Sequence, residues 1–140
     1  MSVDFFLDTN VIVYSFDSTA PAKAEESRRL LGASLREGTG AVSWQVVQEF
    51  SNLALRKFAS PMTVADCDMY LRRVLFPLCR VWPSQALYSD ALELVEETGY
   101  HYYDCLIVAA ALESGAARLF TEDLQSGRKV RSLEIVNTFP

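Results

Sequence analysis

Residues 3–10, Val-Asp-Phe-Phe-Leu-Asp-Thr-Asn, join a short apolar run to an acid at a change of pattern. The run Val3–Leu7 has the length and composition of a buried β-strand. Asp8 follows it directly, before a brief helix that we expect over Val11–Phe16. An Asp between a strand and a helix is a common helix N-cap, and it also stands where parallel sheets form their sites. This stretch therefore predicts a strand–helix unit with an acid at its turn.

The alternation of strand and helix patterns continues to the end of the chain. Further stretches of strand length lie at Ala41–Ser43, Leu78–Val81, Arg118–Thr121 and Leu133–Val136. Helical patterns separate them, at Pro21–Glu37, Trp44–Phe58, Thr63–Leu75, Ser84–Thr98 and Tyr102–Ser114. Strands separated by helices imply right-handed crossovers and a parallel sheet. We therefore predict one α/β domain over residues 1–140, a three-layer αβα sandwich with a central parallel sheet.

The composition excludes several classes of protein. A chain of 140 residues, 50% of them hydrophobic, is long enough to bury one core. The longest apolar run, Cys105–Leu112, is far shorter than the roughly 20 residues of a membrane span, so we expect no membrane association. The first residues carry acids and no Lys or Arg, unlike a secretory signal. Three cysteines without Cys-x-x-Cys spacing suit reduced thiols in the cytoplasm, and a single histidine argues against zinc.

Four acids occupy positions that this topology brings to one edge of the sheet. Asp8 and Asp123 follow strands, whereas Glu49 and Asp104 lie on helices that follow loops. Clustered carboxylates resist ionising together unless a cation compensates them, and oxygen ligands alone favour Mg²⁺ or Mn²⁺. Such a metal activates a bound water and neutralises charge on a phosphate, without a nucleophilic side chain. We predict that these four acids are the metal ligands and catalytic residues of a phosphodiesterase.

Each acid also has a structural interpretation. Asp8 fits a helix N-cap, and Glu49 lies at the edge of the apolar arc of its helix, where a carboxylate can reach water. Asp104 is followed by apolar residues three, four and seven positions along its helix, which places it within a buried face. An unpaired buried carboxylate is costly, so for Asp104 we favour a ligand over a cap.

The fourth acid has a neighbour that competes with it. Asp123 also fits a turn, or the cap of a short helix over Leu124–Gly127. Glu122 precedes it, and strand alternation does not decide between the two. Both remain candidates for the fourth position.

Four short motifs contain these acids and span most of the chain. They are Asp8-Thr9-Asn10, Val47-Gln48-Glu49-Phe50, Tyr103-Asp104 running into Ile107-Val108-Ala109-Ala110-Ala111, and Thr121-Glu122-Asp123. In order and spacing they resemble the PIN-domain ribonucleases, and specifically the VapC-type toxins of bacterial toxin–antitoxin pairs. The resemblance implies a five-stranded parallel αβα sandwich, an endoribonuclease activity that uses Mg²⁺ or Mn²⁺, and a cognate antitoxin protein as partner. It makes the four acids the site, with Thr9, Asn10 and Thr121 supporting them.

Partner surfaces are also suggested by the helix Trp44–Phe58. Its apolar arc is wider than the ~100° of one packing face, and we expect Leu55 and Phe58 to extend it past the core. An antitoxin segment or a second copy in a homodimer would cover them. Arg56 and Lys57 are candidate contacts to RNA phosphates, although the net charge of −5 argues mildly against nucleic-acid binding unless cations occupy the cleft.

Two alternatives use an acidic pocket without RNA cleavage. One is a receiver-like signalling domain, which needs a phospho-accepting Asp at the end of a central strand. This chain has Ala41-Val42-Ser43 there, and it lacks a Lys after a late strand. The other is a non-catalytic PIN scaffold that only binds partners, which the presence of all four acids disfavours.

Overall fold

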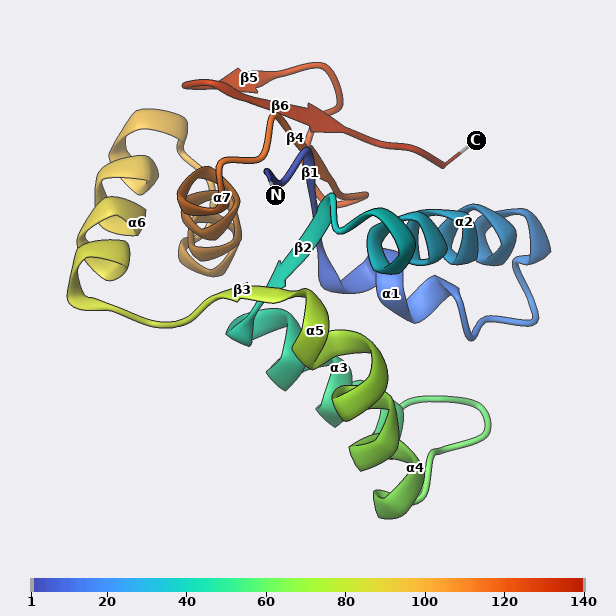
Figure 1. The fold of residues 1–140 in the computed structure, drawn as a ribbon. Helices are drawn as coiled ribbons and strands as arrows, with labels where there is room; N and C mark the ends of the chain where they lie inside the picture. Colours follow the sequence, from blue (N-terminus) through green and yellow to red (C-terminus); the bar gives the residue numbers. More distant parts are fainter. Residues whose placement is uncertain (1, 140) are drawn as a thin grey trace.

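A six-stranded sheet in the order β3-β2-β1-β4-β6-β5 runs through the computed structural model, which describes residues 2–139 (Figure 1). The strands are β1 Phe5–Leu7, β2 Gly40–Ser43, β3 Cys79–Val81, β4 Arg118–Phe120, β5 Lys129–Val130 and β6 Leu133–Val136. All neighbouring pairs are parallel except β5 and β6, which form an antiparallel hairpin. The predicted α/β architecture with a parallel sheet is confirmed, and β5 is the strand that the sequence pattern did not predict.

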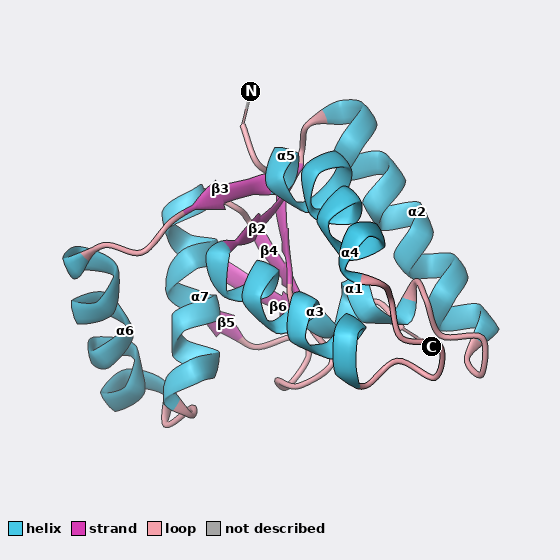
Figure 2. Ribbon diagram, turned by 90° about the horizontal axis from the view of Figure 1, so that it is seen from below, coloured by secondary structure: helices cyan, strands magenta, loops and turns pink. Residues whose placement is uncertain are grey.

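Helices cover both faces of this sheet. They are α1 Thr9–Tyr14, α2 Pro21–Glu37, α3 Trp44–Arg56, α4 Val64–Tyr70, α5 Phe76–Leu78, α6 Gln85–Thr98 and α7 Tyr102–Ser114, with a π-helical segment η1 Leu71–Leu75 joining α4 to α5. One face carries α7, which contacts β1 to β4 and has α6 on its outer side. The other face carries α1 and α2 (Figures 1 and 2). From the carboxyl end of β2, α3 leads away from the sheet, and α4 packs against α3.

The helix boundaries follow from capping residues that the sequence displays. Asp8 accepts a hydrogen bond from the Thr9 backbone N–H at the start of α1, at 2.7 Å. Ser84 accepts one from Leu87 N–H at the start of α6, at 3.1 Å. Gly99 ends α6 in the left-handed conformation, with φ of 76°, which glycine adopts without steric cost.

The helix α7 is enclosed on all sides instead of showing one buried face. Every residue from Cys105 to Ala111 is buried, because the sheet covers one side of the helix and α6 the other. Asp104 lies one residue before this buried stretch, in the first turn, and is only partly buried. The predicted position of Asp104 within a buried face was therefore wrong, since the burial begins after it.

Two other local features can be compared with the sequence analysis. Leu55 and Phe58 are partly buried and pack against the core, and the Phe58 ring lies 5.2 Å from that of Phe16 and 5.9 Å from that of Phe50, so part of the expected apolar surface is covered within this chain. The range Leu124–Gly127 is not helical. Across residues 2–139, none of the helices combines the length and apolar character that a membrane crossing requires.

Candidate active site

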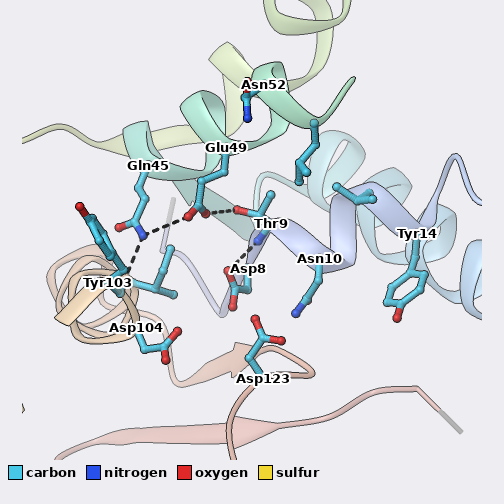
Figure 3. A pocket seen from close by; sticks show the side chains of 13 residues that line it. Asp8, Thr9, Asn10, Tyr14, Gln45, Glu49, Asn52, Tyr103, Asp104 and Asp123 are labelled. Carbon is cyan, nitrogen blue, oxygen red and sulfur yellow. Dashed lines mark hydrogen bonds between the residues drawn. The ribbon is translucent and has the colours of Figure 1, made fainter. Parts of the chain in front are cut away.

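A pocket of about 520 Å³ opens where β1 and β4 end, and all four predicted acids line it (Figure 3). Asp8 follows β1 and Asp123 follows β4, while Glu49 comes from α3 and Asp104 from the first turn of α7. The other polar residues of the lining are Thr9, Asn10, Tyr14, Gln45, Asn52 and Tyr103. The fold thus brings together acids that are up to 115 positions apart, from 8 to 123.

Asp8 is the most deeply buried of these acids, with 7% of its surface exposed. Its Oδ1 accepts a hydrogen bond from Thr9 N–H, and its Oδ2 accepts one from the Thr121 hydroxyl at 2.8 Å. Burial raises the pKa of Asp8 from 3.8 to about 6, although these hydrogen bonds act to lower it. The charges of Asp123 and Glu49 raise it further. The N-cap role and a place in the pocket therefore coexist in one residue.

Glu49 is held by side chains from two elements. Its Oε1 accepts a hydrogen bond from the Thr9 hydroxyl at 2.6 Å, and its Oε2 accepts one from Gln45 Nε2 at 3.5 Å. Gln45 Nε2 also donates to the backbone carbonyl of Tyr103 at 3.1 Å, which ties α3 to the first turn of α7. Sequence reasoning missed Gln45. The signal available was a polar residue one helical turn before Glu49, among apolar neighbours.

Asp104 and Asp123 complete the acidic lining from the opposite side of the pocket (Figure 3). Burial raises the pKa of Asp104, the charges of Asp123 and Glu49 add to the rise, and His101 opposes it. Asp123 is exposed, and its backbone N–H donates to the Thr121 hydroxyl at 3.1 Å. Within residues 2–139, no Lys or Arg forms an ion pair with any of the four acids. Their carboxylates thus have no Lys or Arg partner within these residues.

Glu122, the competing candidate for the fourth position, turns away from the pocket. Its Oε2 lies 2.6 Å from Lys23 Nζ, and its Oε1 accepts a hydrogen bond from the Tyr14 hydroxyl at 2.6 Å. It is not part of the pocket lining, whereas Asp123 is. The structure therefore favours Asp123 over Glu122.

Two further observations bear on what the pocket holds. Among residues 2–139, no three acidic, His or Cys side chains are grouped closely enough to enclose a metal ion by themselves. Both polar atoms of the Asn10 side chain, which lines the pocket, are buried and find no hydrogen-bond partner in the same part of the chain. Buried polar atoms are nearly always satisfied, so this carboxamide is expected to meet water or a bound group.

A family model described as the PIN domain matches residues 5–130. The chain belongs to the PIN-domain family. The matched range contains all four acids of the pocket, and the family resemblance drawn from the sequence motifs is confirmed.

Two solved structures share this PIN fold. One is described as VapBC2 from Rickettsia felis bound to a DNA fragment from their promoter. It is 18% identical, with a TM-score of 0.64 over 95% of this chain and 97% of that one. The other is VapC20 of Mycobacterium tuberculosis, described as a sarcin–ricin loop cleaving toxin. It is 21% identical, with a TM-score of 0.60 over 86% of this chain and 92% of that one. At these identities the likeness shows the fold, and a comparison with curated protein sequences gives no match.

Proposed function

We propose that this PIN domain is an endoribonuclease that hydrolyses RNA phosphodiester bonds with Mg²⁺ or Mn²⁺ held at the acidic pocket, and that it is the toxin of a toxin–antitoxin pair. The observation that carries the proposal is the convergence of Asp8, Glu49, Asp104 and Asp123 on one pocket without a compensating cationic side chain. Like charges brought together in this way are unfavourable unless something positive joins them.

The donor set fits a hard divalent cation. All four side chains offer carboxylate oxygens, and Asn10 adds an unpartnered carboxamide. Mg²⁺ typically retains several waters and takes only one or two carboxylates directly, so a site that is not closed by three acids suits it. Asp8 and Asp104 would hold the cation, and Glu49 and Asp123 would complete its coordination directly or through water. When bound, the metal supplies an activated water and neutralises charge on the phosphate.

The chain's own residues then have distinct tasks. Thr9 and Gln45 orient Glu49, and Thr121 orients Asp8, each by a hydrogen bond to the carboxylate. Neither Ser, Cys nor His lines the pocket as formed by residues 2–139. Water, activated and oriented by the acids and the cation, is therefore the nucleophile that this arrangement favours.

RNA is the substrate class that we propose, on the family membership and on the likeness to VapC20. Tyr103 supports a single-stranded substrate, because this residue is 69% exposed and lines the pocket, where its ring can stack on a base. Arg56 and Lys57, both exposed at the end of α3, are candidates to meet neighbouring phosphates.

An antitoxin protein is the partner that we propose, on the likeness to the VapBC2 complex. Leu55 contributes only in part to a contact surface for this partner, because it is partly buried against the core. A homodimer remains a prediction, and light scattering on the purified protein tests it. A mass of one chain, 15.7 kDa, at micromolar concentration would contradict the dimer.

The proposed function is tested by RNA cleavage in three parallel reactions, with Mn²⁺, with EDTA, and with Mn²⁺ restored. We expect cleavage only in the first and third. Asp8→Asn should be inactive in all three while remaining folded, since Asn also caps helices well. Cleavage that persists in EDTA, or in Asp8→Asn, would contradict the proposal. Metal binding without any cleavage would instead favour the non-catalytic scaffold.

A further inference from the structure

The segment that carries Asp123 leaves β4 and shows no helix or strand from Thr121 until β5 begins at Lys129. Backbone hydrogen bonds hold its two ends, from Thr121 N–H to the Val136 carbonyl at 3.1 Å and from Gly127 N–H to the Ile135 carbonyl at 2.8 Å. Between these ends, no side chain of residues 2–139 hydrogen-bonds the Asp123 carboxylate, and the Asp123 backbone N–H donates to the Thr121 hydroxyl. Asp123 is nevertheless close enough to Asp8 and Asp104 to raise the pKa of both. The segment has one further anchor, next to Asp123.

That anchor is Glu122, which is bonded to the two helices α1 and α2. Its carboxylate accepts one hydrogen bond from the Lys23 ammonium of α2 and one from the Tyr14 hydroxyl of α1, each at 2.6 Å. Lys23 Nζ also donates to the Tyr14 hydroxyl at 3.3 Å. The ammonium lies 4.6 Å from the centre of the Tyr14 ring and 5.7 Å from that of Phe139, and these two rings meet edge to face at 5.0 Å.

A bend at Glu122 and Asp123 explains how this anchor acts on Asp123. The Thr121 hydroxyl donates to the Asp8 carboxylate and accepts from the Asp123 backbone N–H, so residues 121 and 123 are tied together on the side of Asp8. The Glu122 carboxylate between them is bonded by Lys23 and Tyr14, and Glu122 is absent from the pocket lining that includes Asp123. Holding Glu122 between α1 and α2 therefore turns Asp123 toward the other acids.

We infer that Lys23 and Tyr14, acting through Glu122, position Asp123 in the acidic pocket. The inference rests on the proposed function of that pocket and adds three positioning residues, of which Lys23 and Tyr14 lie outside the four motifs that resemble the family. The Glu122 pair differs from an ordinary surface ion pair because two donors converge on one carboxylate and because the adjacent residue lines the pocket. Charge-assisted bonds of this kind are stronger than neutral ones and more exacting in geometry.

A matched control lies on the same helix. Arg29 forms an ion pair with Glu26 on α2, and both residues are remote from the pocket lining. An isolated exposed pair contributes little to stability. If the Lys23–Glu122 pair were only such a pair, Lys23→Met and Arg29→Met would behave alike.

The first measurement needs neither metal nor RNA. Backbone ¹⁵N relaxation is recorded for the metal-free wild type, Lys23→Met, Glu122→Gln and Arg29→Met. We expect the Asp123 amide to be rigid in the wild type and in Arg29→Met, with an order parameter near ~0.85, and to fall below ~0.6 in the other two. Met retains the aliphatic stem of Lys23 over the rings, so a fall reports the lost charge. An Asp123 amide that is mobile in the wild type, or equally rigid in all four proteins, overturns the inference.

The second measurement is Mn²⁺ binding by calorimetry, with RNA cleavage alongside. Residues that orient ligands typically change metal affinity by ~10-fold or more, and we expect that loss in Lys23→Met and Glu122→Gln but not in Arg29→Met. The turnover number should fall while KM for RNA changes little, since none of these groups is placed to hold RNA. A wild type that neither binds Mn²⁺ nor cleaves RNA contradicts the proposed function, whereas the relaxation data decide the positioning role by themselves.

Discussion

Two acidic clusters of this PIN domain differ in whether a basic side chain pairs with their carboxylates. On α6, the carboxylates of Asp90, Glu93 and Glu97 surround Arg131 from the β5–β6 hairpin, with the nearest nitrogen–oxygen distances at 2.8, 3.7 and 3.1 Å. Asp90 and Glu97 raise the pKa of Arg131, because they favour its charged form. Every acid there has a cation beside it.

Within residues 2–139, the pocket acids have no Lys or Arg beside them, and the pKa values of two of them move in the unfavourable direction. The pKa of Asp8 is raised to about 6, and the pKa of Asp104 is also raised, in each case mainly by burial. The acids of α6 form ion pairs that fix the β5–β6 hairpin to the helix. The pocket instead holds like charges close together, which destabilises the folded state. The number of acids alone therefore does not distinguish a structural cluster from a candidate site. What distinguishes them is whether the acids line a pocket and whether basic side chains neutralise them.

The largest expected effect is on catalysis, and it separates the two clusters directly. Asp104→Asn removes a charge that the bound metal requires, which is commonly worth several kcal/mol, so we expect RNA cleavage to fall by ~100-fold or more. The control is Glu93→Gln in the α6 cluster, which should cleave at the wild-type rate. Initial rates on one labelled RNA measure both. If Asp104→Asn cleaved as well as Glu93→Gln, the two clusters would not differ in function.

The next effect is on stability as a function of pH in EDTA. Because the pKa of Asp8 is about 6 in the folded state against an ordinary value of 3.8, the folded state binds this proton more tightly than the unfolded chain. Stability from this group is therefore present at low pH and lost as the pH rises from about 3.8 to about 6. The loss is on the order of 3 kcal/mol.

Urea denaturation at pH 5 and pH 7 measures the part of this loss that occurs above pH 5, with Asp8→Asn as the reference that removes the titration and keeps the helix cap. We expect the wild type to lose more stability than Asp8→Asn between the two values. Parallel changes in the two proteins would mean that Asp8 titrates normally, and that its burial carries no charge penalty.

The next smaller effect is the change in melting temperature that a metal ion causes. A cation that binds only the folded state adds about 2.7 kcal/mol at a hundredfold excess over its Kd. We expect Mg²⁺ or Mn²⁺ to raise the Tm of the wild type, and Asp104→Asn to respond less while melting no lower than the wild type in EDTA, since it relieves repulsion.

The paired cluster provides the contrast for this melt. Asp90→Asn breaks one ion pair to Arg131, so its free energy of unfolding should fall by at most about 1 kcal/mol. Its Tm should therefore be slightly lower than that of the wild type both in EDTA and in metal, and metal should raise its Tm as much as it raises that of the wild type. If metal raised the Tm of Asp104→Asn as much as that of the wild type, Asp104 would not be a metal ligand and would only be a residue of the first turn of its helix.

The smallest expected effect concerns RNA affinity at the edge of the pocket. Arg56→Ala should weaken RNA binding and lower the slope of log affinity against log salt by ~0.7, the contribution of one phosphate contact on a single strand. Arg36→Ala is the control, because Arg36 is exposed in the last turn of α2, before the amino end of β2. Fluorescence anisotropy at several salt concentrations measures both. Identical slopes in the two variants would show that Arg56 does not contact an RNA phosphate.

Most of the fold was predictable because its signals are local. Strand length, the N-caps Asp8, Thr63 and Ser84, and glycines such as Gly99 each reveal an element from a few adjacent residues. The convergence of the acids was predictable from topology, since carboxyl ends of parallel strands share one edge.

The features that sequence reasoning missed depend on distant contacts. The hairpin of β5 and β6 turns at Arg131, a non-glycine residue with φ of 54°, and the acids beside it lie on α6, more than 30 positions earlier in the chain. No turn signature of Gly or Asn announces it. The environment of Asp104 depends on α6 covering α7, and the orientation of Glu122 depends on Lys23, so neither was visible in a local pattern.

The four acids of the pocket come from β1, α3, α7 and the segment after β4, which has a consequence for the protein during its synthesis. Asp123 is near the end of the chain, and β4, which positions it, pairs between β1 and β6. A nascent chain with Asp123 still inside the ribosomal tunnel holds at most three of the acids, and the sheet that aligns them is incomplete. If the proposed activity is correct, this domain cannot act on RNA until β4 and the segment after it have left the tunnel and joined the sheet.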